Sequence, residues 1–221
     1  MLTLPDFVPF AEFESHKQTN PKYVRSFNIS DLANAARTEL SDSDPECYKI
    51  FCLGLIFGLR RNEIDKLQWP AFRPTEGVIR IEPTDCFSPK TKSSCADLPI
   101  SDPAVASLLS QWQARATGRF VVEGSGHVTD SYHLRCETIF IRLNRWLRAH
   151  GVTAAKPLHT LRKEHGSIMC DNFGIFAAKT ALRHSNIAMT SSCCAADKAV
   201  ALPNAGLLLN GEPANVIPIA L

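Results

Sequence analysis

One histidine and two arginines, in two separate segments of this chain, have the types and spacing to bind a phosphate group. His159 and Arg162 stand three positions apart in HTLR, so a helix would place them on one face. Arg60 follows an apolar run in GLRRNE, where Glu63 can orient its guanidinium by a charge-assisted hydrogen bond. A guanidinium offers a phosphate fixed bidentate donors, and an imidazole can donate or shuttle a proton. These residues suggest stabilisation of a reacting phosphodiester.

Each signal alone has a simpler interpretation. Arg60 and Glu63 would serve equally as a helix cap and a surface ion pair, and HxxR often occurs by chance. An isolated histidine such as His184 is more often a structural residue with satisfied hydrogen bonds. It is the combination of the segments that points to one site.

The segments together resemble the tyrosine recombinases, the phage-integrase family. GLRRNE matches the family motif Gly-x-Arg-x-x-Glu, which assigns the first catalytic arginine to Arg60. HTLRKEHGS resembles the second box, His-x-Leu-Arg-(His/Lys), with His159, Arg162 and a supporting Lys163. By this resemblance the residues surround one scissile phosphate.

The segment ALRHSNIAMT extends the resemblance. The family usually reads Leu-Gly-His-Ser there, which places His184 as a buttress of the phosphate site. Arg183 replaces the usual glycine, and we expect this replacement to be mild. The resemblance also implies a general-acid lysine on a β-hairpin loop, for which SPKTKSS offers Lys90, with Lys92 as the alternative.

The chain departs from the family at the nucleophile. Nine residues after His184, where the family carries its tyrosine, stands Cys193, or Cys194 if the register shifts by one. The three tyrosines of the chain lie far away, at 23, 48 and 132. A cysteine is shorter by a ring, and its thiolate is a soft nucleophile for a hard phosphorus centre despite a pKa of about 8.5 against about 10. We therefore expect an impaired recombinase domain, with a non-catalytic DNA-binding remnant or regulator as the alternative.

Other cysteine chemistries fit less well. Cys136 and Arg142 have the C-x5-R spacing of phosphatases, but the residues between them form an apolar helix rather than a phosphate loop. A protease built on Cys193 and His184 lacks an identifiable orienting acid or amide. The eight cysteines contain no CxxC pair, so we expect reduced thiols and no metal site. No cofactor is expected.

Charge is unevenly distributed along the chain. Residues 135–184 contain nine Lys or Arg and three acids, although the whole chain carries a formal charge of only +2. A basic face of this kind suits a polyanion, and with the resemblance it predicts double-stranded DNA as the partner. The side chains expected to contact the DNA backbone are Arg142, Arg145, Arg148, Lys179 and Arg183. The resemblance further implies a homo-oligomer, a tetramer on DNA.

The coarse pattern predicts a mainly α-helical domain with a small antiparallel β-sheet (α+β), in agreement with the resemblance. We expect helices near 30–40, 47–59, 62–69, 103–115 and 136–150, then three more at 159–171, 174–183 and 186–194. Strands are expected at 78–83 and 95–101, as a hairpin, with one more within 118–126.

Three parts are expected: a linker or arm at 1–29, an integrase-like catalytic domain at 30–195, and a C-terminal tail at 196–221. The tail is apolar and is a candidate for exchange between subunits. No apolar run is long enough to cross a membrane and no export signal opens the chain, so we expect a cytoplasmic, nucleoid-associated protein of bacterial or phage type.

Overall fold

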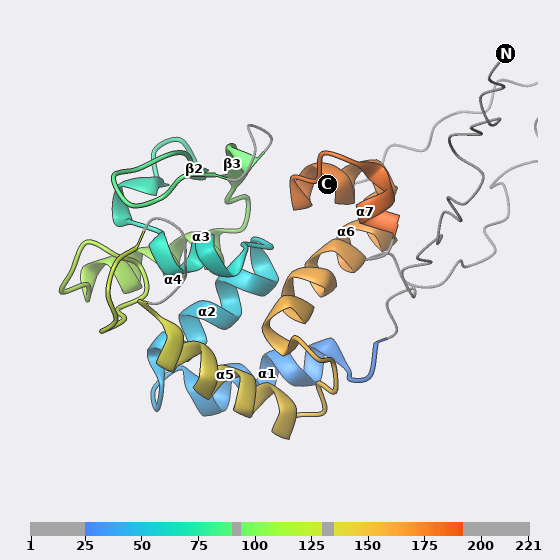
Figure 1. The fold of residues 1–221 in the computed structure, drawn as a ribbon, viewed down its shortest axis with the longest axis horizontal. Coiled ribbons are helices and arrows are strands. Elements are labelled where there is room, and N and C mark those ends of the chain that lie inside the picture. Colours follow the sequence, from blue (N-terminus) through green and yellow to red (C-terminus); the bar gives the residue numbers. More distant parts are fainter. Residues whose placement is uncertain (1–24, 90–93, 130–134, 192–221) are drawn as a thin grey trace, which may run out of the picture.

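The computed structural model describes residues 25–89, 94–129 and 135–191. At its centre lies helix α2 (Pro45–Ile56), which is apolar on nearly all sides. Ile50 and Leu53 of α2 are fully buried, and the helix packs against α1 (Ile29–Leu40), α5 (Glu137–Ala149) and α6 (Pro157–Leu182). Figure 1 shows α1 and α5 at the opposite end of the molecule from the small sheet.

The β-sheet has three antiparallel strands in the order β1-β2-β3, with bounds Phe72–Arg73, Val78–Ile81 and Ala96–Pro99. Ile79 pairs with Phe72 on one side and with Leu98 on the other. These three side chains are buried in the core, whereas Arg80, which points to the other face, pairs with Asp97. The alternation in VIRI therefore anchors the hairpin to the core through one face.

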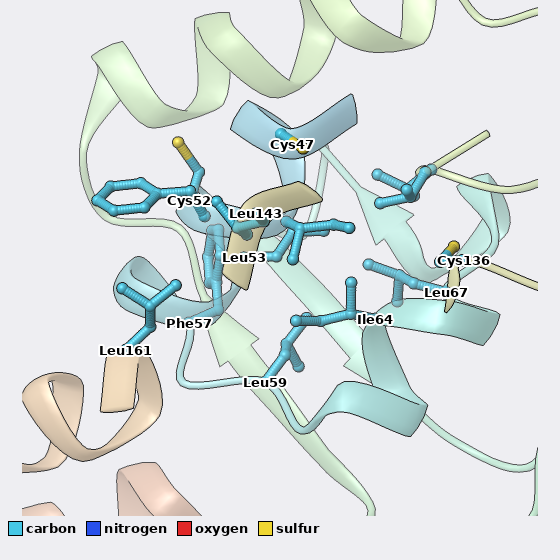
Figure 2. Packing of buried hydrophobic residues seen from close by; sticks show 14 of the residues in the cluster. Cys47, Cys52, Leu53, Phe57, Leu59, Ile64, Leu67, Cys136, Leu143 and Leu161 are labelled. Carbon is cyan, nitrogen blue, oxygen red and sulfur yellow. The ribbon is translucent and has the colours of Figure 1, made fainter. Parts of the chain in front are cut away.

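The remaining helices are short or peripheral. They are α3 (Arg61–Lys66), the 3₁₀ turn η1 (Trp69–Ala71), α4 (Pro103–Ala114) and α7 (Ile187–Ser191). The core joins them to the central helix: Figure 2 shows Leu161 of α6 beside Phe57, and Ile64 and Leu67 of the α3 segment facing Leu53. None of the helices in the described ranges combines the length and hydrophobicity needed to cross a bilayer.

Most of the predicted helices and strands are present, but their ends differ from the predicted ones. The first helix is capped by Asn28, whose side chain accepts from the backbone N–H groups of Ser30 and Asp31, so it begins at Ile29. The third helix begins one residue earlier than expected, at Arg61 with Arg60 as its N-cap, and ends three residues earlier, at Lys66. The strand expected within 118–126 is wrong: only an isolated bridge between Gln68 and Phe120 forms there.

Helix α6 is interrupted at Gly174, whose φ of 83° and ψ of 171° are accessible almost only to glycine. The break separates the two helices that the sequence predicted as 159–171 and 174–183. In a straight helix Leu182 would lie about 30 Å beyond Arg162. Instead the Arg162 guanidinium donates to the Leu182 carbonyl, because the second half of α6 returns toward the first.

The cysteines follow the expectation only in part. Within the described residues the free thiols are Cys47, Cys52, Cys86, Cys95 and Cys136. Cys170 is instead disulfide-bonded, contrary to the expectation of reduced thiols. Burial raises the pKa of the Cys136 thiol to about 12, so that this sulfur is held as an unreactive thiol in the core.

Candidate functional site: a basic cavity between α3 and α6

A cavity of about 660 Å³ lies where the α2–α3 corner meets the start of α6. Arg60, His159, Arg162 and His184 all line it, although they come from segments about a hundred residues apart. The two guanidinium groups singled out in the sequence therefore face one space. More basic side chains complete the wall: Arg61, Arg148, Lys156 and Lys163.

Arg60 is held by the residue that the motif predicted. Its Nη1 donates to Glu63 Oε1 at 2.7 Å, and its backbone N–H donates to Glu63 Oε2 at 2.7 Å. Arg60 Nη2 also donates to the backbone carbonyl of Arg183 at 3.1 Å. Glu63 is buried, whereas about a third of the Arg60 side chain is exposed. The carboxylate thus lies beneath the guanidinium and aims it into the cavity.

Arg162 is anchored by main-chain carbonyls. Its Nη1 donates to Gly58 and its Nη2 donates to Leu182, and the side chain is only 3% exposed. Leu161 beside it is fully buried in the core, so the helical phase that buries Leu161 directs Arg162 toward the cavity. Sequence reasoning missed both carbonyl partners, because a main-chain acceptor leaves no residue-type signal.

The two cavity histidines are kept neutral. Partial desolvation, followed by the positive charges of Arg162 and Lys163, lowers the pKa of His159 to about 4, although the side chain is solvent-exposed at the cavity. Burial, followed by the charge of Arg162, lowers the pKa of His184 to about 4. His184 Nδ1 lies 3.1 Å from Thr190 Oγ1 of α7, which fixes the ring orientation. At neutral pH both imidazoles are uncharged hydrogen-bonding groups.

Four of the five residues expected to contact the DNA backbone divide into three kinds. Arg148 is exposed and lines the cavity, and Arg145 is exposed on the same helix. Arg142 is exposed but forms two hydrogen bonds to Asp44, at 2.7 and 3.0 Å. Lys179 is half-buried on α6, away from the cavity lining.

Arg183 was expected to lie on the DNA-contacting surface and to replace glycine at little cost, and the structure differs on both points. It is 5% exposed, and its Nη2 donates to Glu63 Oε2 at 2.5 Å. Its φ of 53° and ψ of 44° are left-handed, because it forms the C-cap of α6. Glycine adopts this conformation without the steric cost of a Cβ, so the replacement is not mild: it costs about 1–2 kcal/mol.

Four predicted residues lie outside the described ranges: the hairpin lysines Lys90 and Lys92, and the nucleophile position Cys193 with its neighbour Cys194. Their assignments stay predictions. Asn144 and Lys156 are among the cavity residues that sequence reasoning missed. The Asn144 amide oxygen accepts from the Leu158 backbone N–H at 3.1 Å, which caps the first turn of α6. Lys156, immediately before that turn, was counted only toward the basic segment.

Within residues 25–89, 94–129 and 135–191, no three His, Cys, Asp or Glu side chains converge to hold a metal ion. The charged side chains that line the cavity carry guanidinium or ammonium groups. Such a cavity, with neutral imidazoles at its edge, is suited to binding a phosphate or a phosphodiester.

Comparison with known proteins identifies the family and the fold of this chain. The sequence model of the phage integrase family matches residues 22–199. A search of curated protein sequences finds no match. Among solved structures, XerA recombinase superposes with a TM-score of 0.57 at 16% identity, over 79% of this chain and 62% of that one.

Two further structures contain DNA. A lambda integrase tetramer bound to a Holliday junction has a TM-score of 0.56 and 15% identity, over 78% of this chain and 49% of that one. The Tn1549 transposon integrase in complex with circular intermediate DNA has a TM-score of 0.56 and 16% identity, over 79% and 63%. The chain thus spans less than two thirds of each of these structures. Because the family model matches most of the sequence and the fold is shared, this chain belongs to the phage integrase family and has the fold of a tyrosine-recombinase catalytic domain.

Proposed function

We propose that this chain is a site-specific DNA recombination domain whose cavity binds a scissile phosphate of double-stranded DNA. The observation that carries the proposal is the convergence of Arg60, Arg162, His159 and His184 on one cavity. In this proposal the two guanidinium groups bind the non-bridging oxygens, where negative charge increases in the transition state. The neutral imidazoles donate hydrogen bonds to the same oxygens.

The proposed chemistry is a displacement at phosphorus. A nucleophile at position 193 forms a bond to phosphorus while the bond to the 5′-oxygen breaks, and Lys90 or Lys92 supplies the proton to that leaving oxygen. The rejoining strand reverses the step. With cysteine at position 193 the sulfur is expected to fall short of the phosphorus, so the parent chain binds DNA but forms little or no covalent product.

Binding to DNA is expected to depend on the basic surface around the cavity. Arg145 and Arg148 on α5, together with Lys156 and Lys163, would contact phosphates flanking the scissile one. Each such contact makes the affinity for DNA fall more steeply as salt increases. The slope of log K against log salt changes by about −0.9 for every phosphate neutralised. Assembly into a tetramer on DNA, the form in which the lambda integrase neighbour is bound to a Holliday junction, belongs to the same proposal.

Covalent trapping on nicked suicide duplexes of randomised sequence tests the proposal. We expect no adduct with the parent chain and an adduct with Cys193→Tyr. The matched control is Cys193→Phe, which supplies the ring without the hydroxyl and should not react. Cys194→Tyr tests the register that is shifted by one residue.

The alternative function, a non-catalytic DNA-binding regulator, gives a different outcome. In that case none of the tyrosine variants forms an adduct, while the parent and the variants retard duplex DNA equally on a gel. Loss of DNA retardation in Arg162→Ala would still place the binding in this cavity. An absence of any salt-dependent affinity for DNA in the parent chain would refute both functions.

A further inference from the structure

Arg183 holds an unusual backbone conformation. Among the described residues it is the only non-glycine residue with a positive φ, 53°, at the C-cap of α6. An L-residue in the left-handed region costs about 1–2 kcal/mol, which glycine would avoid. Strain of this kind persists where the surrounding structure requires the side chain, so it is a starting point for a functional hypothesis.

Burial of the Arg183 side chain also carries a desolvation cost. It is 5% exposed, and burial lowers the pKa of its guanidinium. Its Nε and Nη1 have no hydrogen-bond partner among the residues that the structure describes. A buried guanidinium with incomplete hydrogen bonding is unfavourable unless a charged partner compensates for the desolvation. That partner is Glu63.

Two routes lead from Arg183 to Arg60. Through the side chain, Arg183 Nη2 donates to Glu63 Oε2 at 2.5 Å, and Glu63 Oε1 accepts from Arg60 Nη1 at 2.7 Å. Through the main chain, the Arg183 carbonyl accepts from Arg60 Nη2 at 3.1 Å. Arg60 lines the cavity but Arg183 does not, so Arg183 acts on the cavity only through other residues.

We infer that Arg183 is a positioning residue for Arg60 in phosphate binding. Its guanidinium shares the negative charge of Glu63, so that Glu63 neutralises Arg60 less completely. It also fixes the carboxylate that aims Arg60 into the cavity. The inference rests on the proposed function of the cavity as a phosphate site, and adds a residue beneath the site that controls how strongly Arg60 binds the anion.

Titration with inorganic phosphate tests this inference. The ring signals of His159 and His184, which line the cavity, report binding by NMR. The proteins compared are the parent chain, Arg183→Gly, Arg183→Lys, Arg60→Ala, and the double variant Arg60→Ala/Arg183→Gly. Glycine suits the left-handed cap and keeps the main-chain carbonyl, so Arg183→Gly removes the side-chain route alone.

We expect Arg183→Gly to raise the dissociation constant for phosphate by about fivefold, the net contribution of one ordinary hydrogen bond, because Arg183 acts on the anion only through Arg60. Arg183→Lys, which keeps a cation beside Glu63, should bind within about twofold of the parent. In the Arg60→Ala background the further change to glycine should alter affinity by less than about twofold, because the two residues act as one unit. Thermal melting of each variant confirms that the fold is retained.

The outcomes separate the inference from the proposed function. If Arg60→Ala binds phosphate as the parent does, the cavity is not the phosphate site and the proposed function fails. If Arg60→Ala weakens binding but Arg183→Gly does not, the proposed function stands and the inference is overturned. An equal loss from Arg183→Gly in both backgrounds also overturns it, because Arg183 would then act without Arg60.

Discussion

A methyl group added at Gly58 would be forced against the imidazole of His165. An ideal Cβ at this position lies 2.6 Å from His165 Cδ2 and 3.0 Å from Cγ. The ring has little room to withdraw, because its Nδ1 lies 3.1 Å from the carbonyl of Leu55. Gly58 also has a φ of 58°, and its carbonyl accepts from Arg162. Gly58→Ala therefore acts on the backbone, on His165 and on the anchor of Arg162.

The expected destabilisation has two parts. The left-handed backbone costs about 1–2 kcal/mol for any residue with a Cβ. Displacing the imidazole from a packed position adds about 1–3 kcal/mol, as other overpacking substitutions do. We therefore expect Gly58→Ala to lower the free energy of unfolding by about 2–5 kcal/mol.

Urea unfolding measures this change, and Gly151→Ala is the matched control. Gly151 also has a positive φ, 84°, but an added Cβ there meets nothing within 4 Å. The control should lose only the backbone part, about 1–2 kcal/mol. In His165→Ala the ring is absent, so adding Gly58→Ala should then cost no more than the control does. Equal losses from Gly58→Ala and Gly151→Ala in the parent chain would refute the reasoning.

Three further predictions concern anchors and pH. Arg162→Lys leaves the carbonyl of Gly58 or of Leu182 without its donor, so urea unfolding should show a free energy of unfolding lower by about 1–3 kcal/mol. An unchanged free energy of unfolding would mean that water replaces the guanidinium. Asp44→Ala removes the N-cap of α2 and the partner of Arg142, and should cost about 1–2 kcal/mol by the same assay, whereas Arg142→Ala should cost less because it leaves the cap intact. Burial lowers the pKa of His165 to about 4, so unfolded chains bind more protons than folded ones between pH 4 and about 6.5. The free energy of unfolding should therefore be highest above about pH 6.5 and fall as the pH drops toward 4. The fall should be smaller in His165→Gln. A free energy of unfolding that does not change with pH over this range would contradict the lowered pKa values of the histidines.

The sequence predicted the cavity residues because their spacing matches helical geometry. His159 and Arg162 are one turn apart on a helix whose inward face carries Leu161, and that pattern determines which side chains face the cavity. Arg60 was identified by its position after a buried helix and by Glu63 three residues later. Both signals are local, but each alone also fits a surface helix, and it was the resemblance of the combined segments to the phage-integrase family that predicted one shared site.

The conformation and the burial of Arg183 could not be predicted in the same way. Its charge placed it with the surface arginines, but its position at the end of α6 required a left-handed cap that turned the side chain inward to Glu63. The conformation depends on the residue at which the helix ends, and helix ends are the part of a helix that sequence patterns predict least well. The strand expected at 118–126 fails for a different reason. Its pairing with the segment before η1 stops after one bridge, where the Val121 N–H donates to the Leu67 carbonyl at 2.9 Å, and Val121 and Val122 are buried in the core.

The break at Gly174 has a consequence for how the cavity forms during folding. Arg162 and its Leu182 acceptor are separated by 20 residues, whereas Arg162 and its Gly58 acceptor are separated by 104. Closing the longer loop costs about 1.5 kcal/mol more chain entropy. The helical hairpin of α6 can thus close as a local unit, and the anion-binding wall becomes complete only when the distant Gly58–Glu63 corner docks against it. On partial denaturation, amide exchange should reveal the corner detaching first while the hairpin stays protected.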